Sequence, residues 1–507
     1  MKKILFSILC FCFLSLMAVA QNNQPLWTVK AVKQIDNFGR YKEVNINRAA
    51  IEKLYFSDES YLQLPLTDKN GNGLIADLVA KPMENVKVKL NNSQYTSNVK
   101  LPKTFAGKIR GAGYVNNVML TIAPNYISLQ AYLDTENILL EPDSRNRDEF
   151  VLMHTPEITY QQKPWQCGIS ADLPATVKKR QTLSTNSTLA SSDKCTFVFV
   201  DCSNALYNNN NSDVQNTVNY VYTIWNNLRT SYNNEQMNVL ISEINVWTTA
   251  DPFDVSGTSQ TANRSFANFY QDNYWGNMAL LLDWSTVNGG IAGGYGWAKS
   301  VSPNTCGNYN ATPQPSWNFG SFAYCNLNGN GTFINAPIPA LGWQIEVCIH
   351  ELGHLFSSWH TQFCRWPGGP IDNCVAIEGS CTPMPSPGPA PTNGGTFMSY
   401  CHLSSVSINF NNGFGPLPGD TIRKFVVNNT CISNCTSCIT NDVIGNISVT
   451  GFQQKEVTNQ LIANGTLTTP NGFLKLDAGN RVVLQAGFRV LQGNKVHVII
   501  DGCGGIR

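Results

Sequence analysis

The chain has 507 residues, with 35 Lys and Arg against 34 Asp and Glu, so its formal net charge is +1. Only 14% of the residues are charged, which excludes nucleic-acid binding driven by a basic surface. Hydrophobic residues make up 42%, which excludes a mainly disordered chain, and the length corresponds to about three domains.

Residues 1–20 predict a secretory signal peptide. Lys2 and Lys3 precede an apolar run over residues 4–16, and three small residues at 18–20 form a cleavage site before Gln21. The run is slightly short for a membrane span, and no later stretch is long and apolar enough to cross a bilayer. We therefore expect a secreted, extracellular protein without a transmembrane anchor.

The chain has 16 cysteines, of which Cys10 and Cys12 leave with the signal peptide, so 14 remain. In an oxidising compartment a disulfide is the default expectation for each of them. The spacing does not assign the pairs.

Residues 21–180 predict a β-rich first segment. Residues 86–90 alternate as a half-buried strand does, and residues 118–122 form a more continuously apolar strand. Residues 68–73 begin like a calcium loop, but Val79 stands at the twelfth position, where such loops need a bidentate glutamate. We therefore expect an Asn-Gly turn between two strands there, and the sequence does not support calcium binding.

Residues 181–194 predict a linker. The stretch over residues 176–194 is polar and rich in Ser and Thr, and it includes the basic triplet at 178–180. Such a triplet in a flexible tether is an accessible place for proteolytic nicking, and a plain solvated charge run is the alternative.

Residues 195–430 predict an α/β domain. Its strands are expected at residues 196–201, 238–247 and 278–283, from runs of buried apolar residues. Ser212 with Gln215 forms a capping box for a helix whose apolar stripe reaches residue 228, and residues 261–273 predict a second helix. The Gly-rich residues 289–297 lack a following Gly-Lys-Ser/Thr helix start, so we expect an edge strand rather than a phosphate loop.

Two further segments follow. Residues 365–420 are rich in Pro, Gly and Cys, which predicts a loop region stapled by cysteines. Residues 431–507 show short alternating strands and Asn-Gly turns at a period of roughly ten residues, which predicts a small all-β module without acid/base chemistry.

The strongest motif is Cys348-Ile-His-Glu-Leu-Gly-His354. Two histidines four residues apart lie on one helix face and can reach one metal ion, while Glu351 projects beside them toward a bound water. A catalytic zinc site needs three protein ligands and an open position, and His360 supplies the third if the helix ends near Ser357. A structural zinc site is the alternative, but it favours four protein ligands and gains nothing from the glutamate.

With the later Gly395-Thr-Phe-Met398-Ser-Tyr400, the chain resembles the metzincin clan of zinc endopeptidases. The resemblance implies that one catalytic zinc is held by His350, His354 and His360. It further implies that Glu351 is the general base and that Met398 lies beneath the metal. Tyr400 matches a tyrosine that ligates zinc or stabilises the oxyanion in some metzincins.

Within the clan, residues 195–430 resemble the reprolysin (adamalysin-like) family, especially its bacterial members, and the first segment resembles a reprolysin prodomain. Ser357 stands where the extended motif has glycine, so it must adopt a strained backbone or a different turn. Thr361 stands where reprolysins carry aspartate, and pappalysin-like metzincins remain the alternative.

Pro164-Trp-Gln-Cys167-Gly, near the end of the first segment, resembles the cysteine switch of metzincin prodomains. Its thiolate would then occupy the open zinc position until the segment is removed. A disulfide is the alternative for Cys167, and a switch would leave an odd number of other cysteines.

We therefore expect an α/β (α+β) metzincin catalytic domain with a β-rich prodomain and a small all-β C-terminal module. The expected function is a secreted zinc endopeptidase made as a zymogen, with an extended polypeptide substrate along Gly294, Tyr295 and Gly296. The alternative is a non-enzymatic surface adhesion protein with a degenerate protease domain. The C-terminal module resembles small β-repeats of exported Gram-negative proteins, which implies contact with the secretion machinery or attachment to the outer cell surface.

Overall fold

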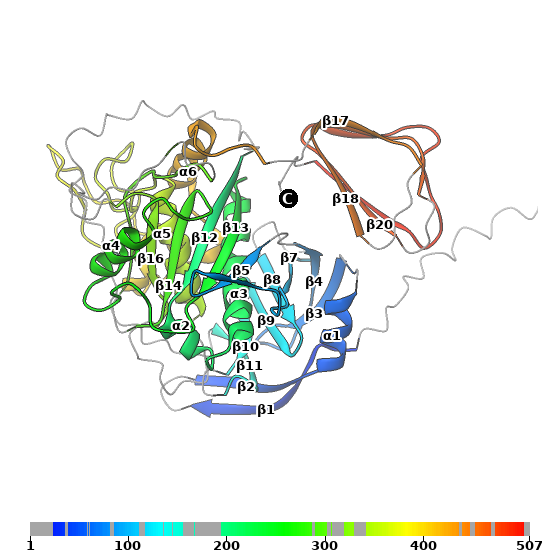
Figure 1. The fold of residues 1–507 in the computed structure, drawn as a ribbon, viewed down its shortest axis with the longest axis horizontal. Helices are drawn as coiled ribbons and strands as arrows, with labels where there is room; N and C mark the ends of the chain where they lie inside the picture. The colour runs from blue at the N-terminus through cyan, green and yellow to red at the C-terminus, as the bar shows by residue number, and fades with distance from the viewer. Residues whose placement is uncertain are drawn as a thin grey trace, which may run out of the picture.

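The computed structural model describes residues 24–35, 39–57, 59, 61–81, 86–110, 117–134, 136–143, 146–155, 167, 194–285, 289–301, 306, 319–328, 341–435, 439–446, 452–467 and 472–500. Two sheets lie side by side, and a separate coil of strands follows them (Figure 1). The predicted signal peptide, and all of the predicted linker except Lys194, lie outside the described residues.

The first sheet is antiparallel, in the order β1-β2-β11-β10-β9-β8-β7-β4-β3, and helix α1 (Arg48–Phe56) accompanies it. Its strands are β1 (Trp27–Ile35), β2 (Gly39–Ile46), β3 (Tyr61–Thr67), β4 (Gly73–Ala80), β7 (Lys103–Ile109), β8 (Asn117–Ala123), β9 (Tyr126–Tyr132), β10 (Asn137–Pro142) and β11 (Phe150–His154). Strand β8 confirms the strand predicted at residues 118–122. It is buried along its whole length because its two faces contact α1 and α3 (Val214–Asn234).

The predicted turn between β3 and β4 is confirmed. The Asp68 carboxylate accepts hydrogen bonds from the backbone N–H groups of Asn70 (2.9 Å) and Asn72 (2.7 Å), and Gly71 has a φ of +88°. The carboxylate is therefore engaged within the turn, as expected for an Asx-type loop.

The second sheet has the order β15-β16-β14-β12-β13-β5-β6. Its strands are β12 (Cys195–Cys202), β13 (Asn238–Val246), β14 (Met278–Asp283), β15 (Gly290–Ala292), β16 (Phe322–Asn326), β5 (Lys87–Leu90) and β6 (Gln94–Thr96). The strands predicted in the α/β domain are confirmed as β12, β13 and β14. Strand β15 is antiparallel to β16 and forms one edge of the sheet.

Strand β5 confirms the strand predicted at residues 86–90, but it does not join the sheet of the first segment. It pairs in parallel with β13, so a hairpin of the first segment completes the second sheet. Alternation identifies a strand with one buried face and carries no information about which distant strand will pair with it.

Helices α3 and α5 (Leu341–Leu355) pack against each other, while α4 (Ser259–Tyr270) packs on β15 and β16. The predicted capping box is wrong by one residue, because Asp213 is the N-cap of α3 and accepts from the N–H of Asn216 at 2.7 Å. Gln215 instead hydrogen-bonds the backbone of Lys100 in the first segment. The remaining helices are α2 (Asn204–Asn209), α6 (Pro416–Asn428) and two short 3-10 turns at Cys401–Leu403 and Phe410–Asn412.

Four disulfides join the described cysteines: Cys195–Cys435, Cys306–Cys431, Cys364–Cys381 and Cys374–Cys401. The last two confirm that residues 365–420 are a cysteine-stapled loop region. The expectation of a disulfide at every mature cysteine is wrong, because Cys167, Cys202, Cys325 and Cys348 are buried outside these pairs. Three of them lie in core strands or in α5, where a thiol packs as a small apolar group.

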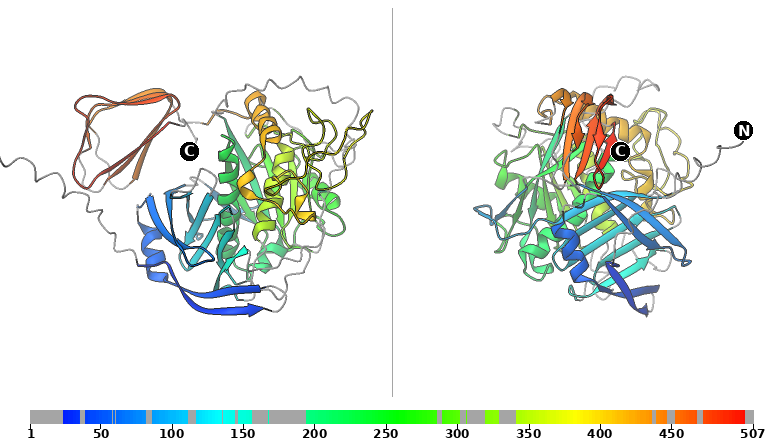
Figure 2. Two further views of the ribbon diagram at one scale, coloured as in Figure 1. Left: turned by 180° about the vertical axis from the view of Figure 1, so that it is seen from behind. Right: turned by 90° about the vertical axis from the view of Figure 1, so that its right-hand side faces the viewer.

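Residues 439–499 form a triangular coil (Figure 2). Its strands are β17 (Ile439–Ile444), β18 (Phe452–Ala463), β19 (Thr466–Leu467), β20 (Phe473–Ala478), β21 (Arg481–Leu484), β22 (Arg489–Val490) and β23 (Lys495–Ile499). Every strand pair of this region is parallel, and paired residues are 18 to 23 positions apart, so one turn of the coil takes 18 to 23 residues; Phe452, for example, pairs with Phe473. The predicted period of about ten is therefore not the structural repeat, because the chain stacks whole turns rather than hairpins.

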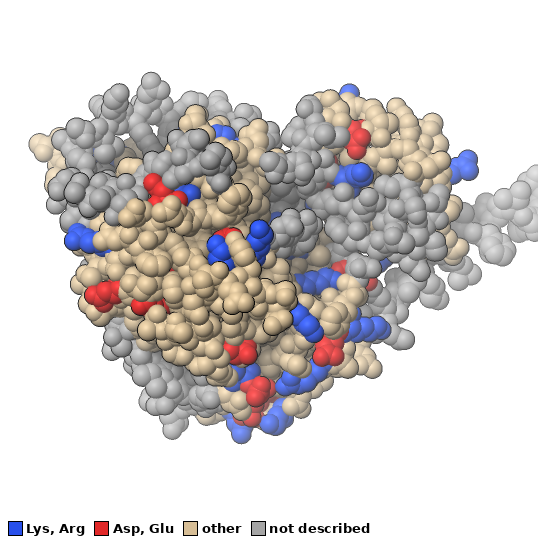
Figure 3. Space-filling model, in the orientation of Figure 1, with Lys and Arg blue, Asp and Glu red and all other residues tan. Residues whose placement is uncertain are grey.

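Two properties concern the outer surface. On the face shown in Figure 3, acidic and basic side chains are interspersed and form no continuous basic patch. Among the described helices, none is both long and apolar enough to span a membrane.

Candidate metal centre

Three histidine side chains converge at the end of α5. His350 and His354 lie one turn apart on this helix, and His360 follows after the chain has turned back. The Nε2 atom of His354 lies 3.1 Å from that of His350 and 3.0 Å from that of His360. All three side chains are almost completely buried.

The outer nitrogen of each ring has an oxygen partner. His350 Nδ1 lies 2.7 Å from the Phe397 carbonyl oxygen, His354 Nδ1 lies 2.8 Å from that of Ser358, and His360 Nδ1 lies 2.7 Å from Glu378 Oε2. These oxygens can only accept a hydrogen bond, so each Nδ1 donates and each Nε2 keeps its lone pair. The three lone pairs face one small volume.

This donor set fits a metal ion. Burial, followed by the charge of neighbouring histidines, lowers the pKa of His350 and of His354 well below the usual range, which keeps both rings neutral. Neutral imidazole is the form that binds metals, and three such nitrogens with one further position suit a catalytic zinc ion. Cys167 supplies a fourth candidate ligand, because its Sγ and the three histidine nitrogens all lie within 4.8 Å of one another.

The chain reverses directly after α5. The N–H of Ser357 bonds the His354 carbonyl at 2.7 Å, and that of Ser358 bonds the Gly353 carbonyl at 2.9 Å. Ser357 has a φ of +79°, which is the strained backbone predicted for a serine at this position. This turn brings His360 back to the two helical histidines.

Met398 is fully buried and packs directly against α5. A Cβ atom at Gly353 would lie only 2.5 Å from Met398 Sδ, so the glycine permits this close approach. The backbone around Met398 also contacts the histidine residues and their neighbours. The Met398 carbonyl accepts a hydrogen bond from the Thr361 N–H at 3.0 Å, and the Phe397 carbonyl accepts one from His350 Nδ1.

Glu351 lies beside the histidines and is completely buried. Its Oε2 atom is 3.5 Å from Cys167 Sγ, and its Oε1 has no hydrogen-bond partner among the described residues. Burial raises the pKa of Glu351 well above its usual range. A Cβ atom at Gly290 would lie 2.6 Å from Glu351 Oε1, so strand β15 borders the carboxylate closely.

Cys167 is buried against Tyr400, whose hydroxyl oxygen accepts the Cys167 N–H at 2.9 Å. The alternative expectation of a disulfide at Cys167 is not met. The residues on either side of it lie outside the described part of the chain. The ring of Tyr400 lies 4.7 Å from that of His360, so the hydroxyl group, the thiol and the histidines share one site.

The substrate strand predicted at Gly294, Tyr295 and Gly296 is wrong in position. Strand β15 ends at Ala292, and Gly294 and Gly296 have φ values of 141° and 75°. The Gly296 N–H bonds the His354 carbonyl at 3.1 Å, and the Tyr295 ring lies edge-on to His354. Glycines permit both an open edge strand and left-handed turns, and here the turns support the end of α5.

No motif in the sequence predicted a role for Glu378. Its carboxylate accepts a hydrogen bond from the third histidine, His360, which lies 18 residues earlier in the chain. The available signal was weak: Glu378 is one of two acidic residues in the loop that the Cys364–Cys381 disulfide closes. His402 lies outside the histidine cluster, and its Nδ1 is 3.0 Å from Glu346 Oε1.

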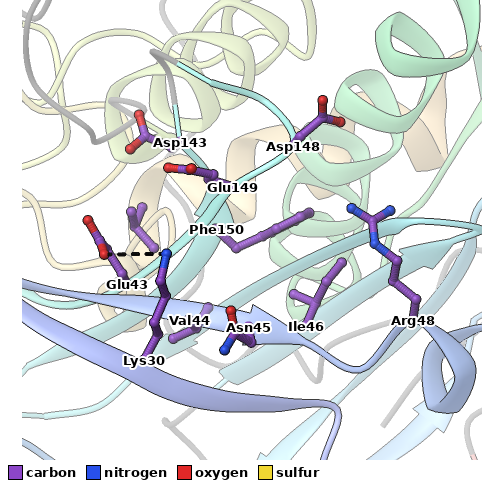
Figure 4. A pocket seen from close by; sticks show the side chains of 11 residues that line it. Lys30, Glu43, Val44, Asn45, Ile46, Arg48, Asp143, Asp148, Glu149 and Phe150 are labelled. Atoms are coloured by element: carbon purple, nitrogen blue, oxygen red, sulfur yellow. Dashed lines mark ion pairs between the residues drawn. The ribbon is translucent and has the colours of Figure 1, made fainter.

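The first segment contains two cavities that share no residue with this centre. One of about 160 Å³ is lined by charged side chains including Lys30, Glu43 and Arg48 (Figure 4). The other, of about 1250 Å³, is lined mainly by apolar residues of β1, β3 and α1.

Residues 191–410 match the sequence model of the Reprolysin_5 family, described as metallo-peptidase family M12. No curated protein matches the chain. Among solved structures, metalloproteinase-II from Bacteroides fragilis aligns with 10% identity over 66% of this chain and 90% of that one, with a TM-score of 0.35. A chaperone–substrate complex aligns with 9% identity over 61% of this chain and 38% of that one, with a TM-score of 0.24. The family match includes the three histidines, Glu351, Met398 and Tyr400.

Proposed function

We propose that this chain, whose residues 191–410 match the model of a reprolysin-type metallopeptidase family, is a metzincin: a secreted zinc endopeptidase made as a latent precursor. One observation carries the proposal: three histidine lone pairs converge beside a buried glutamate, with a cysteine thiol at the fourth position. In the proposed division of the chain, residues 21–180 are the prodomain, 181–194 the linker, 195–430 the catalytic domain and 431–507 a terminal module.

His350, His354 and His360 would hold the zinc ion. When bound, zinc lowers the pKa of water and polarises a peptide carbonyl group. Glu351 then takes the proton of the attacking water on its carboxylate and passes it to the nitrogen of the leaving amine. Its burial supports this role, because a carboxylate with a raised pKa retains the proton until the amine departs.

Tyr400 is proposed to act on the carbonyl oxygen of the scissile peptide bond. Its hydroxyl oxygen accepts the Cys167 N–H in the latent chain, and burial raises its pKa well above the usual range. A phenol that stays protonated can donate a hydrogen bond to the oxyanion that develops on the carbonyl oxygen.

The substrate is proposed to lie extended along the edge strand β15 rather than along Gly294–Gly296. Among the described strands β15 pairs with β16 alone, and Gly290 in this strand borders Glu351. A peptide that adds to the sheet by backbone hydrogen bonds would bring its scissile bond beside the general base.

Latency is proposed to depend on Cys167. Its thiolate would fill the fourth zinc position and exclude water, while its contacts with Glu351 and Tyr400 engage both groups that act on substrate. Removing the first segment would free the fourth zinc position, Glu351 and Tyr400. The four disulfides are consistent with an extracellular protein, which supports export.

The terminal module is proposed to contact the cell surface or the secretion machinery. It holds none of the proposed site residues, and it exposes apolar side chains that suit a partner surface: Val443, Leu484, Val490, Leu491 and Val498.

The direct test of the function is Glu351→Ala in the processed protein. We expect hydrolysis of a protein substrate to fall by on the order of 10³-fold, because general acid–base catalysis contributes about 10² to 10⁴. Zinc content should stay at one ion per chain, since Glu351 is not a ligand. Chelation should abolish wild-type activity and added zinc restore it; an equally active Glu351→Ala protein would sink the mechanism.

A further inference from the structure

The third histidine differs from the other two in what holds it. The Nδ1 atoms of His350 and His354 donate to neutral backbone carbonyl groups, whereas that of His360 donates to the carboxylate of Glu378 at 2.7 Å. A charged acceptor makes the stronger hydrogen bond, and it also makes the opposite ring nitrogen a better metal ligand.

The position of this carboxylate is fixed by backbone contacts with the segment that follows His360. The Glu378 N–H bonds the Gln362 carbonyl at 3.1 Å, and the Glu378 carbonyl accepts the Cys364 N–H at 2.9 Å. The side chain of Gln362 donates to the same Oε2 atom at 3.2 Å. These contacts, and not the side-chain rotamer of Glu378 alone, hold its carboxylate beside His360.

A disulfide holds these two segments together. Cys364 and Cys381 are 17 positions apart in the sequence, and they lie one and three residues from Phe363 and Glu378, which form an isolated β-bridge. Gly379, with a φ of +94°, packs so closely that a Cβ atom would lie 2.5 Å from the Phe363 ring. The disulfide and this close packing therefore keep Glu378 in contact with the segment that follows His360.

We propose that Glu378 is a positioning residue for the third metal ligand, and that the Cys364–Cys381 disulfide sets its position. The inference rests on the proposed function only in requiring that the histidines bind zinc. Glu378 does not touch the substrate or the metal; it keeps the His360 ring in one tautomer and one orientation.

The first test measures zinc affinity, not activity. The dissociation constant of zinc from the full chain is determined by competition with a chromophoric chelator. We expect Glu378→Ala to weaken binding about 10- to 100-fold, the usual effect of removing such a partner. Glu378→Gln should weaken it less, because the amide oxygen still accepts from Nδ1.

Glu346→Gln is the matched control, because Glu346 is a buried carboxylate beside His402, a histidine outside the cluster. Its zinc affinity should stay within about twofold of wild type. Wild-type zinc affinity in Glu378→Ala overturns the inference. Absence of zinc binding by the wild-type chain would instead contradict the proposed function.

The role of the disulfide is tested by the double variant Cys364→Ser with Cys381→Ser. It should weaken zinc binding in the same direction, and adding Glu378→Ala should produce little further loss, because both changes remove one interaction. Fully additive losses overturn this part of the inference. If Glu378→Ala fails to fold, the visible spectrum of the cobalt-substituted Glu378→Gln protein decides: a changed spectrum supports the role, and an unchanged one contradicts it.

Discussion

Ser357 shows how a single backbone angle serves the metal centre. Its φ of +79° ends α5 and returns the chain so that His360 meets the two helical histidines. A side chain in this region costs roughly 1–2 kcal/mol relative to glycine. The motif predicts either this strain or a different turn at Ser357, because the place of the glycine in it is local information, and the strained backbone is the one observed.

We predict that Ser357→Gly raises the free energy of unfolding by about 1 kcal/mol, because it removes the left-handed penalty. Ser357→Ala is the control, since it removes the hydroxyl group and keeps the Cβ atom. Chemical denaturation of both variants measures the difference. A glycine variant no more stable than the alanine variant would show that the turn carries no strain.

Asp201 contributes a pH dependence away from the metal centre. It is fully buried, accepts from Asn245 Nδ2 at 2.7 Å, and burial raises its pKa to about 7. Between about pH 4 and pH 7 the folded chain holds a proton that the unfolded chain has lost, so this contribution to stability is lost as the pH rises through that window.

Asp201→Asn should therefore flatten the pH dependence of unfolding. We expect the wild type to lose up to a few kcal/mol relative to the variant between about pH 4 and pH 7. Denaturation midpoints measured across this range test the expectation. Parallel curves for the two proteins would mean that Asp201 does not titrate there.

At the scale of elements, the β5–β6 hairpin links the first segment to the second sheet. Lys89 Nζ lies 2.8 Å from Glu243 Oε2, and the Tyr95 hydroxyl group donates to Glu243 Oε1 at 2.5 Å. Glu243, on β13, is buried, and the hairpin supplies both its cation, Lys89, and its hydrogen-bond donor, Tyr95.

Lys89→Ala should destabilise the intact chain by about 1–3 kcal/mol, because a buried carboxylate loses its cation. The control is Lys87→Ala, an exposed residue two positions earlier on the same face of the strand, with an expected change within about 0.5 kcal/mol. Equal effects of the two substitutions on the unfolding midpoint would contradict a specific role for the ion pair.

Features that depend on one short stretch of sequence could be predicted, whereas contacts between distant segments could not. The spacing of His350, His354 and His360 depends on one helix and one turn, so it could be predicted from a short stretch. The pairing of β5 with β13 and the approach of Glu378 to His360 depend on contacts between distant segments, which no local pattern encodes. Gly294 and Gly296 were misassigned because glycine allows two backbone conformations.

Considering the whole molecule, the described contacts between the first segment and residues 195–430 include the hairpin on β13, the face of α3, the stacking of Tyr132 on Phe410, and the candidate metal centre at Cys167. In the proposed precursor the segment would therefore both support the fold and close the site. Removing only the thiol should separate these two roles.

We predict that Cys167→Ala lets the uncleaved chain hydrolyse peptide bonds while the wild-type precursor stays inactive, because the fourth metal position becomes open to water. Cys202→Ala, at another buried cysteine outside the disulfides, is the control and should stay latent. The assay is cleavage of a fluorogenic peptide before processing. Equal latency in both variants would assign inhibition to the fold of the segment rather than to the thiol.

In the proposed precursor three histidines hold zinc, and the thiol of Cys167 completes the site in the intact chain. X-ray absorption at the zinc edge measures this most directly. We expect one zinc ion per chain with three nitrogen ligands at about 2.0–2.1 Å and one sulfur at about 2.3 Å, and loss of the sulfur in Cys167→Ala. A spectrum without sulfur in the intact wild-type chain, or with two or more sulfur ligands, would contradict it.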